Sequence, residues 1–228
     1  MCFSTTVSFS TSAALIPIGI YAFNKVMEID SRYLPLALIP FMFGVQQFIE
    51  GFVWNYYDTG NIELMQTYGR GFIFFSHFFW MFWIPLTSWL IEPQPQRKNI
   101  FFALMVIGFT LGIVTILPLL SQSGRLDISV IEHSINYEIH LITHEYITKN
   151  MLRVGYAIIV LAPLLFSSVK ILQNYGLLVS FSVLVTYLFF EYAYVSVWCF
   201  FSAFLSFYIL YHVLHPATLE VIRNGNSQ

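Results

Sequence analysis

A succession of long apolar runs constrains this chain more than any other feature. A helix needs about 20 consecutive apolar residues to cross the hydrocarbon core of a bilayer, and the 228-residue chain contains several runs near that length. Only 10% of its residues are charged and 57% are hydrophobic, whereas soluble domains carry about 25% charged residues. We therefore predict an all-α integral membrane protein whose exterior contacts the lipid bilayer.

The apolar runs predict seven transmembrane helices in a single transmembrane domain. The last stretch, residues 175–214, would be roughly 60 Å long as one helix, about twice the hydrocarbon thickness. It must therefore fold back, and the polar break from Glu191 to Ser196 is the natural turn. The predicted spans are residues 8–24, 33–57, 71–91, 99–120, 152–169, 175–191 and 196–214.

The connections between spans are short, with one exception. Residues 58–70 are predicted to form a polar loop, and residues 121–150 form the only long connection. Residues 135–141 in that connection alternate between apolar and polar, which favours a short strand or hairpin over a helix. We expect residues 121–150 to cap one end of the bundle. No internal repeat is visible, which disfavours an inverted-repeat transporter.

The basic residues predict the orientation, because cytoplasmic loops carry an excess of Lys and Arg. One side of the seven-span arrangement collects Lys25, Arg32, Arg97, Lys98, Lys170 and Arg223. The other side collects Arg70, Arg125, Lys149 and Arg153. We therefore expect a cell-membrane protein with the N-terminus and the long loop outside and the C-terminus in the cytoplasm. No basic residue precedes Lys25, so we expect the first run to persist as a helix and not to be cleaved as a signal peptide.

Composition and missing motifs exclude several classes of protein. The net charge of −2 and the lack of a polybasic stretch argue against nucleic acid as a partner. Retinal is excluded as a cofactor, because no lysine lies in the middle of a span to form the Schiff base. Two cysteines are too few for an iron–sulfur cluster or a zinc site built from four thiolates.

Two ionisable residues inside the predicted spans are the main candidates for a catalytic site. Glu50 lies roughly 10 Å below the outer end of its span, and His77 lies at nearly the same depth on the next, antiparallel span. The two side chains could therefore meet. A carboxylate–imidazole pair could transfer protons or bind a metal. The alternative is a buried polar pair that only fixes the register of two helices.

Further candidate ligands gather on the same, outer side of the membrane. The candidates for a transition-metal site are Cys2, Glu50, His77, His133 and Cys199. Cys2 and Cys199 leave three interpretations open. They could form a disulfide in an oxidising outer compartment, they could be metal ligands, or they could be unrelated thiols.

Four segments carry a resemblance to a known family. They are residues 1–9 (Met-Cys-Phe-Ser-Thr-Thr-Val-Ser-Phe), the Leu-Ile-Pro and Phe-Gly-Val-Gln-Gln-Phe-Ile-Glu-Gly motifs within residues 38–51, residues 133–137 (His-Ser-Ile-Asn-Tyr) and residues 196–201 (Ser-Val-Trp-Cys-Phe-Phe). In these segments the chain resembles a bacterial family of small multi-pass membrane proteins of unknown function. The resemblance extends over the whole chain. It implies a seven-span membrane protein and supplies neither an activity nor catalytic residues.

Three classes of function remain. We favour a non-enzymatic sensor, or an accessory subunit of other membrane proteins, with a polar site in the outer half of the bundle. The alternatives are a membrane-embedded metallohydrolase that acts on lipid and a transporter of a small solute or ion. A transporter needs a water-lined path through both leaflets, whereas the inner halves of these spans are almost purely apolar.

Overall fold

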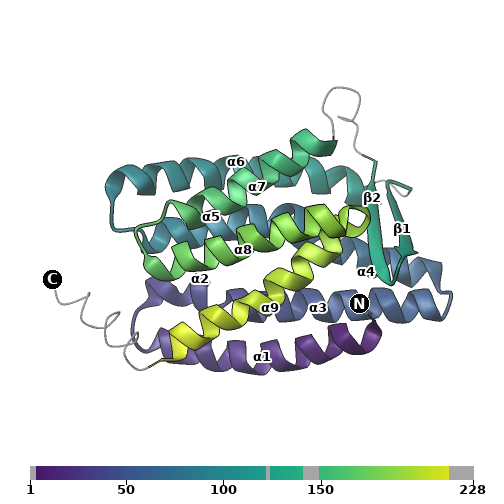
Figure 1. Ribbon diagram of the computed structural model, residues 1–228, viewed down its shortest axis with the longest axis horizontal. Coiled ribbons are helices and arrows are strands. Elements are labelled where there is room, and N and C mark those ends of the chain that lie inside the picture. The colour runs from purple at the N-terminus through teal and green to yellow at the C-terminus, as the bar shows by residue number, and fades with distance from the viewer. Residues whose placement is uncertain (1–3, 122–123, 141–148, 216–228) are drawn as a thin grey trace.

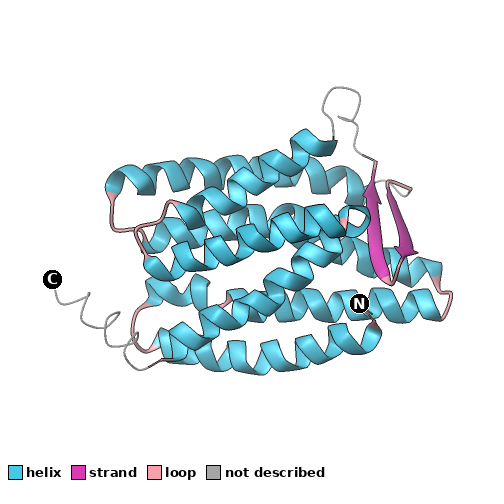
Figure 2. Cartoon of the chain, viewed as in Figure 1, coloured by secondary structure: helices cyan, strands magenta, loops and turns pink. Residues whose placement is uncertain are grey.

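The computed structural model describes residues 4–121, 124–140 and 149–215. These residues form helices that lie side by side along the long axis of the molecule, with a two-stranded hairpin across one end (Figures 1 and 2). Helix α1 begins at the hairpin end, and helix α9 ends at the opposite end (Figure 1). The elements, in order, are α1 (Thr5–Met27), α2 (Leu34–Ala37), α3 (Ile39–Asp58), α4 (Ile62–Phe74), the π-helical segment η2 (Phe75–Phe79), α5 (Trp80–Ile91), α6 (Pro95–Ser121), β1 (Leu126–Ile131), β2 (Ser134–Ile139), α7 (Lys149–Leu165), α8 (Lys170–Phe189), the 3-10 turn η4 (Glu191–Ala193) and α9 (Tyr194–Leu214).

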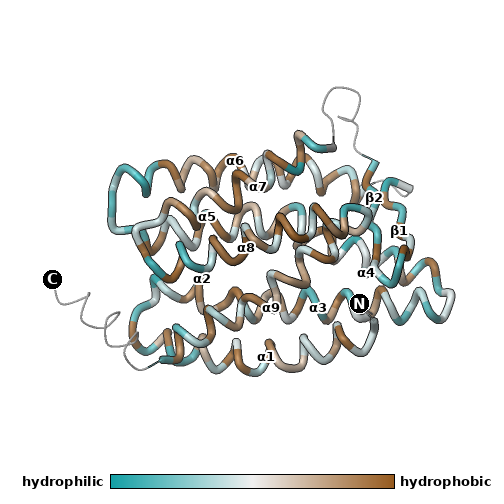
Figure 3. Tube along the Cα trace, viewed as in Figure 1, coloured by the Kyte–Doolittle hydropathy of each residue, from teal (hydrophilic) through white to brown (hydrophobic). Residues whose placement is uncertain are grey.

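Among the described residues, six helical stretches are long and apolar enough to cross a membrane, judged by length and composition. They are Thr5–Met27, Ser31–Asp58, Ile62–Ile91, Pro95–Ser121, Lys170–Phe189 and Glu191–Leu214. A further apolar helix, Asn150–Leu165, is shorter. Apolar residues concentrate along the middle of the bundle, and hydrophilic residues are more frequent near its two ends (Figure 3). A mainly helical fold of the membrane type is therefore confirmed.

The segment between the second and third predicted spans differs from the prediction. Residues 58–70 were expected to be a loop, but α4 begins at Ile62 and runs on through η2 and α5 to Ile91. The side chain of Asn61 caps this helix by accepting a hydrogen bond from the backbone N–H of Leu64 at 3.1 Å. Met65 is buried beneath the hairpin. The polar residues of this segment form the outer face of an amphipathic helix.

The hairpin in the long connection is confirmed. Strand β1 pairs antiparallel with β2, with Leu126 opposite Ile139 and Ile131 opposite Ser134. The two residues of the turn, Glu132 and His133, have positive φ values of 46° and 59°, as a two-residue hairpin turn of type I′ requires.

The hairpin is packed into the bundle and does not merely lie over it. Tyr137 of β2 is buried, and its ring stacks on Phe72 of α4 with centroids 4.7 Å apart and an interplanar angle of 11°. Ile135 is also fully buried and belongs to the same apolar cluster. The inner face of β2 therefore forms the roof of the helical core.

Helix α6 approaches the η2–α5 helix closely at two glycines. A Cβ atom at Gly108 would overlap the carbonyl oxygen of Met81, and a Cβ at Gly112 would lie 2.7 Å from Cδ2 of Phe78. Small residues at such positions let helix backbones approach, which strengthens dispersion contacts between helices in lipid. This approach sets the position of α6 beside the functional region described below.

Glu92 links the α5–α6 connection to the α7–α8 connection by hydrogen bonds, at the end of the bundle opposite the hairpin. Its carboxylate is buried and accepts hydrogen bonds from Ser167 Oγ at 3.0 Å, Ser168 N at 2.8 Å and Gln94 N at 3.2 Å. These bonds explain why α7 ends at Leu165, short of the predicted residue 169, because residues 167–169 turn around the carboxylate. Burial alone would raise the pKa of Glu92, but the hydrogen bonds outweigh it and hold the pKa below its ordinary value of 4.5.

Substituting Gly108 by Ala is expected to destabilise the bundle by about 1–3 kcal/mol, because the added methyl group has to push α6 away from Met81. Gly155→Ala is the matched control, since a Cβ on Gly155 of α7 would meet no atom within 4 Å. Unfolding by sodium dodecyl sulfate in mixed micelles measures both. Equal stability of the two variants would contradict the close contact of α6 with α5.

Acid is expected to weaken the hydrogen bonds that the Glu92 carboxylate accepts from Gln94, Ser167 and Ser168. When the pH falls, the unfolded chain takes up a proton at this residue first, because the pKa is lower in the folded protein. The stabilisation by Glu92 is therefore fully present above about pH 4.5 and is lost as the pH falls through the folded-state pKa. Melting temperatures measured from neutral to acidic pH should show a shallower acid dependence for Glu92→Gln than for the wild type. Glu63→Gln, at an exposed position, should retain the wild-type dependence.

Candidate functional site

Glu50 lies at the centre of a buried polar cluster just beneath the hairpin. Ser196 Oγ of α9 donates a hydrogen bond of 2.6 Å to its Oε1, and Gln47 Nε2 donates one of 3.0 Å to its Oε2. Gln46, one turn before Glu50, accepts a 2.8 Å hydrogen bond from Trp80 Nε1. All of these side chains are buried. The cluster therefore joins α3, α5 and α9 through side-chain hydrogen bonds.

Three buried polar atoms around Glu50 have no hydrogen-bond partner in the described part of the chain. They are Gln46 Nε2, Gln47 Oε1 and the hydroxyl of Tyr137. Tyr137 reaches this cluster from β2 and is buried near both Glu50 and Cys199. Each unpaired buried group costs about 1–3 kcal/mol, so the cluster is not arranged for maximal stability alone.

His77 lies within η2, and this π-helical segment is the one interruption of the long Ile62–Ile91 helix. π-helical turns inside α-helices frequently occur at functional sites. The ring of His77 is only partly buried, and its Nδ1 lies 2.9 Å from Ser76 Oγ. Such a segment cannot be recognised from sequence, because its residues Phe-Ser-His-Phe-Phe carry no signal for the wider turn.

Glu50 and His77 do not form the predicted pair. Within the described residues, the hydrogen bonds of Glu50 go to Gln47 and Ser196, and that of His77 goes to Ser76. The prediction rested on depth along the helices, and depth does not determine the direction in which a side chain points around the helix axis. Glu50 faces α9, whereas His77 faces a pocket beside α7.

This pocket has a volume of about 830 Å³ and lies at the hairpin end of the bundle. Its inner wall includes His77, Trp198 and Cys199, and strand β2 forms its roof. Helices α5, α6 and α7 supply the remaining apolar walls. Those walls are formed by Met81, Leu111, Met151, Leu152 and Ile159.

Charged side chains lie at the rim of this pocket. Arg153 Nη1 donates a 3.2 Å hydrogen bond to Glu191 Oε1, and the guanidinium also lies over the ring of Tyr194, 5.1 Å from its centroid. Glu138 of β2 lines the same side. The pocket thus combines a charged rim, an apolar body and a histidine inside.

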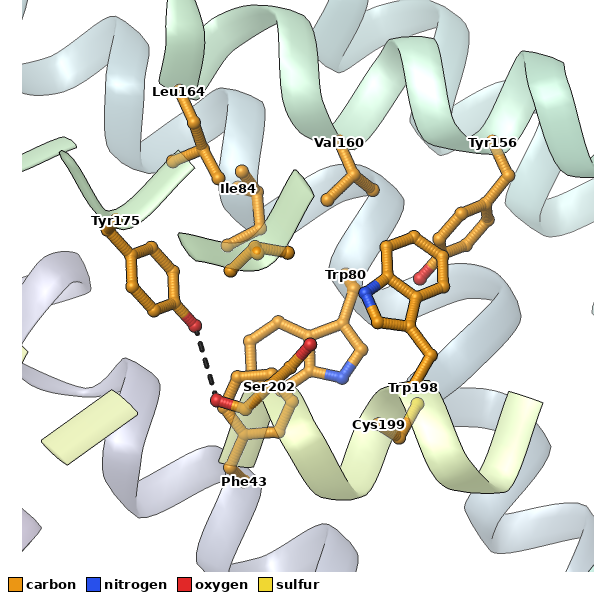
Figure 4. Close-up of a pocket in the computed structure, with 11 residues that line it drawn as sticks. Phe43, Trp80, Ile84, Tyr156, Val160, Leu164, Tyr175, Trp198, Cys199 and Ser202 are labelled. Atoms are coloured by element: carbon orange, nitrogen blue, oxygen red, sulfur yellow. Dashed lines mark hydrogen bonds between the residues drawn. The ribbon is translucent and has the colours of Figure 1, made fainter. Parts of the chain in front are cut away.

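A second, smaller cavity of about 30 Å³ is lined by residues of the bundle core (Figure 4). Phe43, Trp80 and Ile84 line it together with Trp198 and Cys199, which also line the large pocket. Tyr175 donates a 3.4 Å hydrogen bond to the carbonyl oxygen of Ser202 at its far side. The cavity shares Tyr156, Trp198 and Cys199 with the large pocket.

The candidate metal ligands are spread out in the described residues. His133 is exposed in the hairpin turn, whereas Cys199 is buried as a free thiol in the core. Among the described residues, no group of three or more His, Cys, Asp or Glu side chains could hold a metal ion. Cys2 lies outside the described residues. The metal site and the Cys2–Cys199 disulfide therefore stay predictions.

Sequence reasoning missed several residues of this region. Tyr137, Tyr156 and Ser196 were not among the candidates, because neither a tyrosine nor a serine in an apolar chain identifies a site by itself. The alternation in β2 was a usable signal for Tyr137. It places Tyr137 on the same face as Ile135 and Ile139, which are both buried.

Comparison with known proteins gives a family but no activity. A family model described as "Family of unknown function (DUF6629)" matches residues 1–221. No curated protein and no solved structure matches the chain.

Replacing Ser196 by Ala is expected to destabilise the protein by about 1–3 kcal/mol, because the buried carboxylate of Glu50 loses its shorter hydrogen bond. Ser206→Ala on the same helix is the control. Ser206 is also buried, but it donates only to the carbonyl oxygen of Ala203 in its own helix, so a loss of about 0.5 kcal/mol is expected. Unfolding in mixed micelles compares them, and a larger loss for Ser206→Ala would argue against a central role for Glu50.

Proposed function

The chain belongs to a family of unknown function, DUF6629, and we propose from its geometry that it is a seven-span membrane receptor for a small amphiphilic molecule. The large pocket beneath the hairpin carries the proposal. A volume of about 830 Å³ lies within the range of roughly 300–1,000 Å³ that is usual for ligand sites. A mainly apolar wall with a few polar groups is also usual for such sites.

The distribution of polarity along the pocket favours an amphiphile as the ligand. The walls from α6 and α7 are mainly apolar, whereas Arg153 near the start of α7 and Glu191 and Glu138 supply charged groups at the hairpin end. A molecule with a chain or ring system and a polar group would place its apolar part between these helices. A fully polar solute would leave the apolar walls without favourable contacts.

The mouth of the pocket favours entry from the bilayer. Leu111 of α6 is 46% exposed and Met151 of α7 is 62% exposed, and both line the pocket. Apolar side chains that are exposed on a spanning helix face lipid. A ligand dissolved in the bilayer would therefore reach the pocket between α6 and α7 without crossing the charged rim.

Seven spans account for the positions of the chain ends. Helix α7 has 17 residues, about 25 Å at 1.5 Å per residue, which is near the lower limit for a span. With α7 counted, α1 begins and α9 ends on opposite sides of the membrane. The distribution of Lys and Arg supports an orientation with the hairpin and the pocket outside and the C-terminus in the cytoplasm.

A receptor or sensor fits this arrangement better than the two alternatives. A transporter needs a path beyond the pocket, but the smaller cavity, lined by Phe43, Trp80 and Trp198, has a volume of only about 30 Å³. A metallohydrolase needs a set of ligands, and the described residues supply no cluster of three. Other membrane proteins could contact the exposed apolar faces of α6 and α8 and respond to the ligand in the pocket. The protein would then be a subunit of a larger assembly.

Filling the pocket is expected to abolish ligand binding without unfolding the protein. Gly155 lines the pocket, and a Cβ there would meet nothing within 4 Å, so Gly155→Trp should place its indole in the empty space. The probes are sixteen-carbon chains that carry a diazirine and end in an alcohol, a methyl ether or a carboxylate. Photolabelling in lipid nanodiscs, mapped by mass spectrometry, measures binding.

The wild type should be labelled on α6 or α7 at pocket residues by at least one probe, and Gly155→Trp should lower this labelling about tenfold, which corresponds to 1.4 kcal/mol. Leu177→Trp is the control, because Leu177 lies on the outer face of α8 and is 61% exposed. Labelling of the pocket that is equal in all three proteins, or absent from the wild type with every probe, would refute the receptor proposal.

A further inference from the structure

The imidazole of His77 is held in an orientation that leaves one of its nitrogen atoms available to the pocket. Its neighbours Phe75 and Ser76 are buried, whereas the ring of His77 is partly exposed and lines the pocket wall. Nδ1 is engaged by Ser76 Oγ at 2.9 Å. In the described part of the chain, no group forms a hydrogen bond with Nε2.

The two contacts of Ser76 Oγ are consistent with a proton on Nδ1 of His77. The hydroxyl of Ser76 has a single hydrogen, which it donates to the backbone oxygen of Ile73 at 3.3 Å. With this hydrogen on Ile73 O, Ser76 Oγ accepts in its contact with His77 and Nδ1 carries the proton, an assignment that forms part of the inference drawn below. In a neutral imidazole the other nitrogen then carries a lone pair. Nε2 is consequently a hydrogen-bond acceptor at the pocket wall.

The surroundings of His77 favour the neutral ring. Two carboxylates at this end of the bundle have other partners, since Glu50 is bonded to Gln47 and Ser196, and Glu191 is paired with Arg153, while Glu138 lines the pocket from β2. A charged imidazolium among apolar helices would be costly without a counter-ion. The wall around His77 consists of aromatic and aliphatic side chains, among them Tyr156, whose ring centroid is 6.3 Å away.

Tyr156 supplies a complementary donor beside this acceptor. Its ring extends from α7 into the bundle and meets Trp198 edge to face, with centroids 5.2 Å apart (Figure 4). Its hydroxyl has no hydrogen-bond partner among the residues that the structure describes, and the residue lines the large pocket. The wall therefore offers, beside each other, Nε2 of His77 and the phenol of Tyr156 as polar groups.

We propose that the pocket selects amphiphiles that present a hydroxyl group to Nε2 of His77. This inference rests on the receptor function proposed above and names the chemical class of its ligand. A hydroxyl donates to His77 and can accept from Tyr156, so it satisfies both groups. An ether can only accept, and a carboxylate additionally brings a negative charge toward the lone pair. Both leave Nε2 buried without a partner, which lowers affinity.

Competition between the probe chains tests the proposal. Wild-type protein in lipid nanodiscs is photolabelled with the diazirine-bearing sixteen-carbon alcohol, while unlabelled hexadecanol, its methyl ether or hexadecanoate is added at matched mole fractions in the lipid. Hexadecanol is expected to compete about tenfold better than the ether, in line with the loss of one hydrogen bond to a buried acceptor. Equal competition by alcohol and ether would overturn the hydroxyl preference.

Variants separate the role of His77 from general effects on the pocket. His77→Phe removes the acceptor and should bring the alcohol and the ether to within about twofold of each other, while the ether itself competes as in the wild type. Tyr156→Phe should weaken competition by both the alcohol and the ether. The preference for the alcohol should remain, because His77 is unchanged. Ser76→Ala leaves Nδ1 without its acceptor, so the tautomer is no longer determined and the preference for the alcohol should shrink.

The possible failures can be told apart. If all probes label the pocket and Gly155→Trp blocks them, but alcohol and ether compete equally, the receptor proposal stands and the hydroxyl preference is wrong. If no probe labels the pocket, both fail. Should His77→Phe not fold, as judged by size-exclusion chromatography and melting temperature, the Ser76→Ala comparison decides. An unchanged preference in that variant would contradict the assigned tautomer.

Discussion

The hydrogen bond from Ser196 to Glu50 joins two helices whose residues are 146 positions apart in the chain. Helices in lipid gain little from apolar burial against one another, because the lipid tails are as apolar as the side chains. Directional contacts and close packing must therefore define their arrangement. The Glu50 cluster supplies directional contacts at the hairpin end, Glu92 supplies them at the opposite end, and Gly108 permits the close approach of α6.

The pocket follows from how these contacts are distributed. Glu50 holds α3 and α9 together, and Gly108 and Gly112 bring α6 against α5 and η2. Near its start, α7 has no comparable close contact with α6, since a Cβ on Gly155 would meet nothing within 4 Å. A volume between α6, α7 and the hairpin is therefore left open, and His77 lines it.

The candidate residues show how far sequence reasoning reaches. Glu50 was predicted to be buried and near the outer end, because an ionisable side chain inside a span has to face the interior. The depth of His77 was also inferred correctly enough to place it at the hairpin end. Their pairing was wrong because the direction of each side chain depends on helix rotation and on the π-helical turn at Phe75–Phe79. Neither the helix rotation nor the π-helical turn can be inferred from the number of residues to the end of a span.

The α4 extension and Tyr137 are two further differences with physical causes. Residues 62–70 looked like a loop because half of them are polar, but the hairpin covers Met65 and gives this segment an apolar partner. Tyr137 could not be identified as a site residue from the sequence, because its position depends on the packing of β2 against Phe72. In both cases a tertiary contact made by a distant segment determined the role of a locally ambiguous residue.

The sequence by itself determined that this is a helical protein of the membrane type, where its apolar helices lie, and that a hairpin interrupts them. These properties depend on the length of apolar runs and on periodicity, which are local and additive along the chain. Only the tertiary structure decided that Glu50 binds Ser196 and not His77, and that His77 faces a pocket of about 830 Å³. Those properties depend on the rotation and spacing of helices that are far apart in sequence, and the packing of the whole bundle sets both.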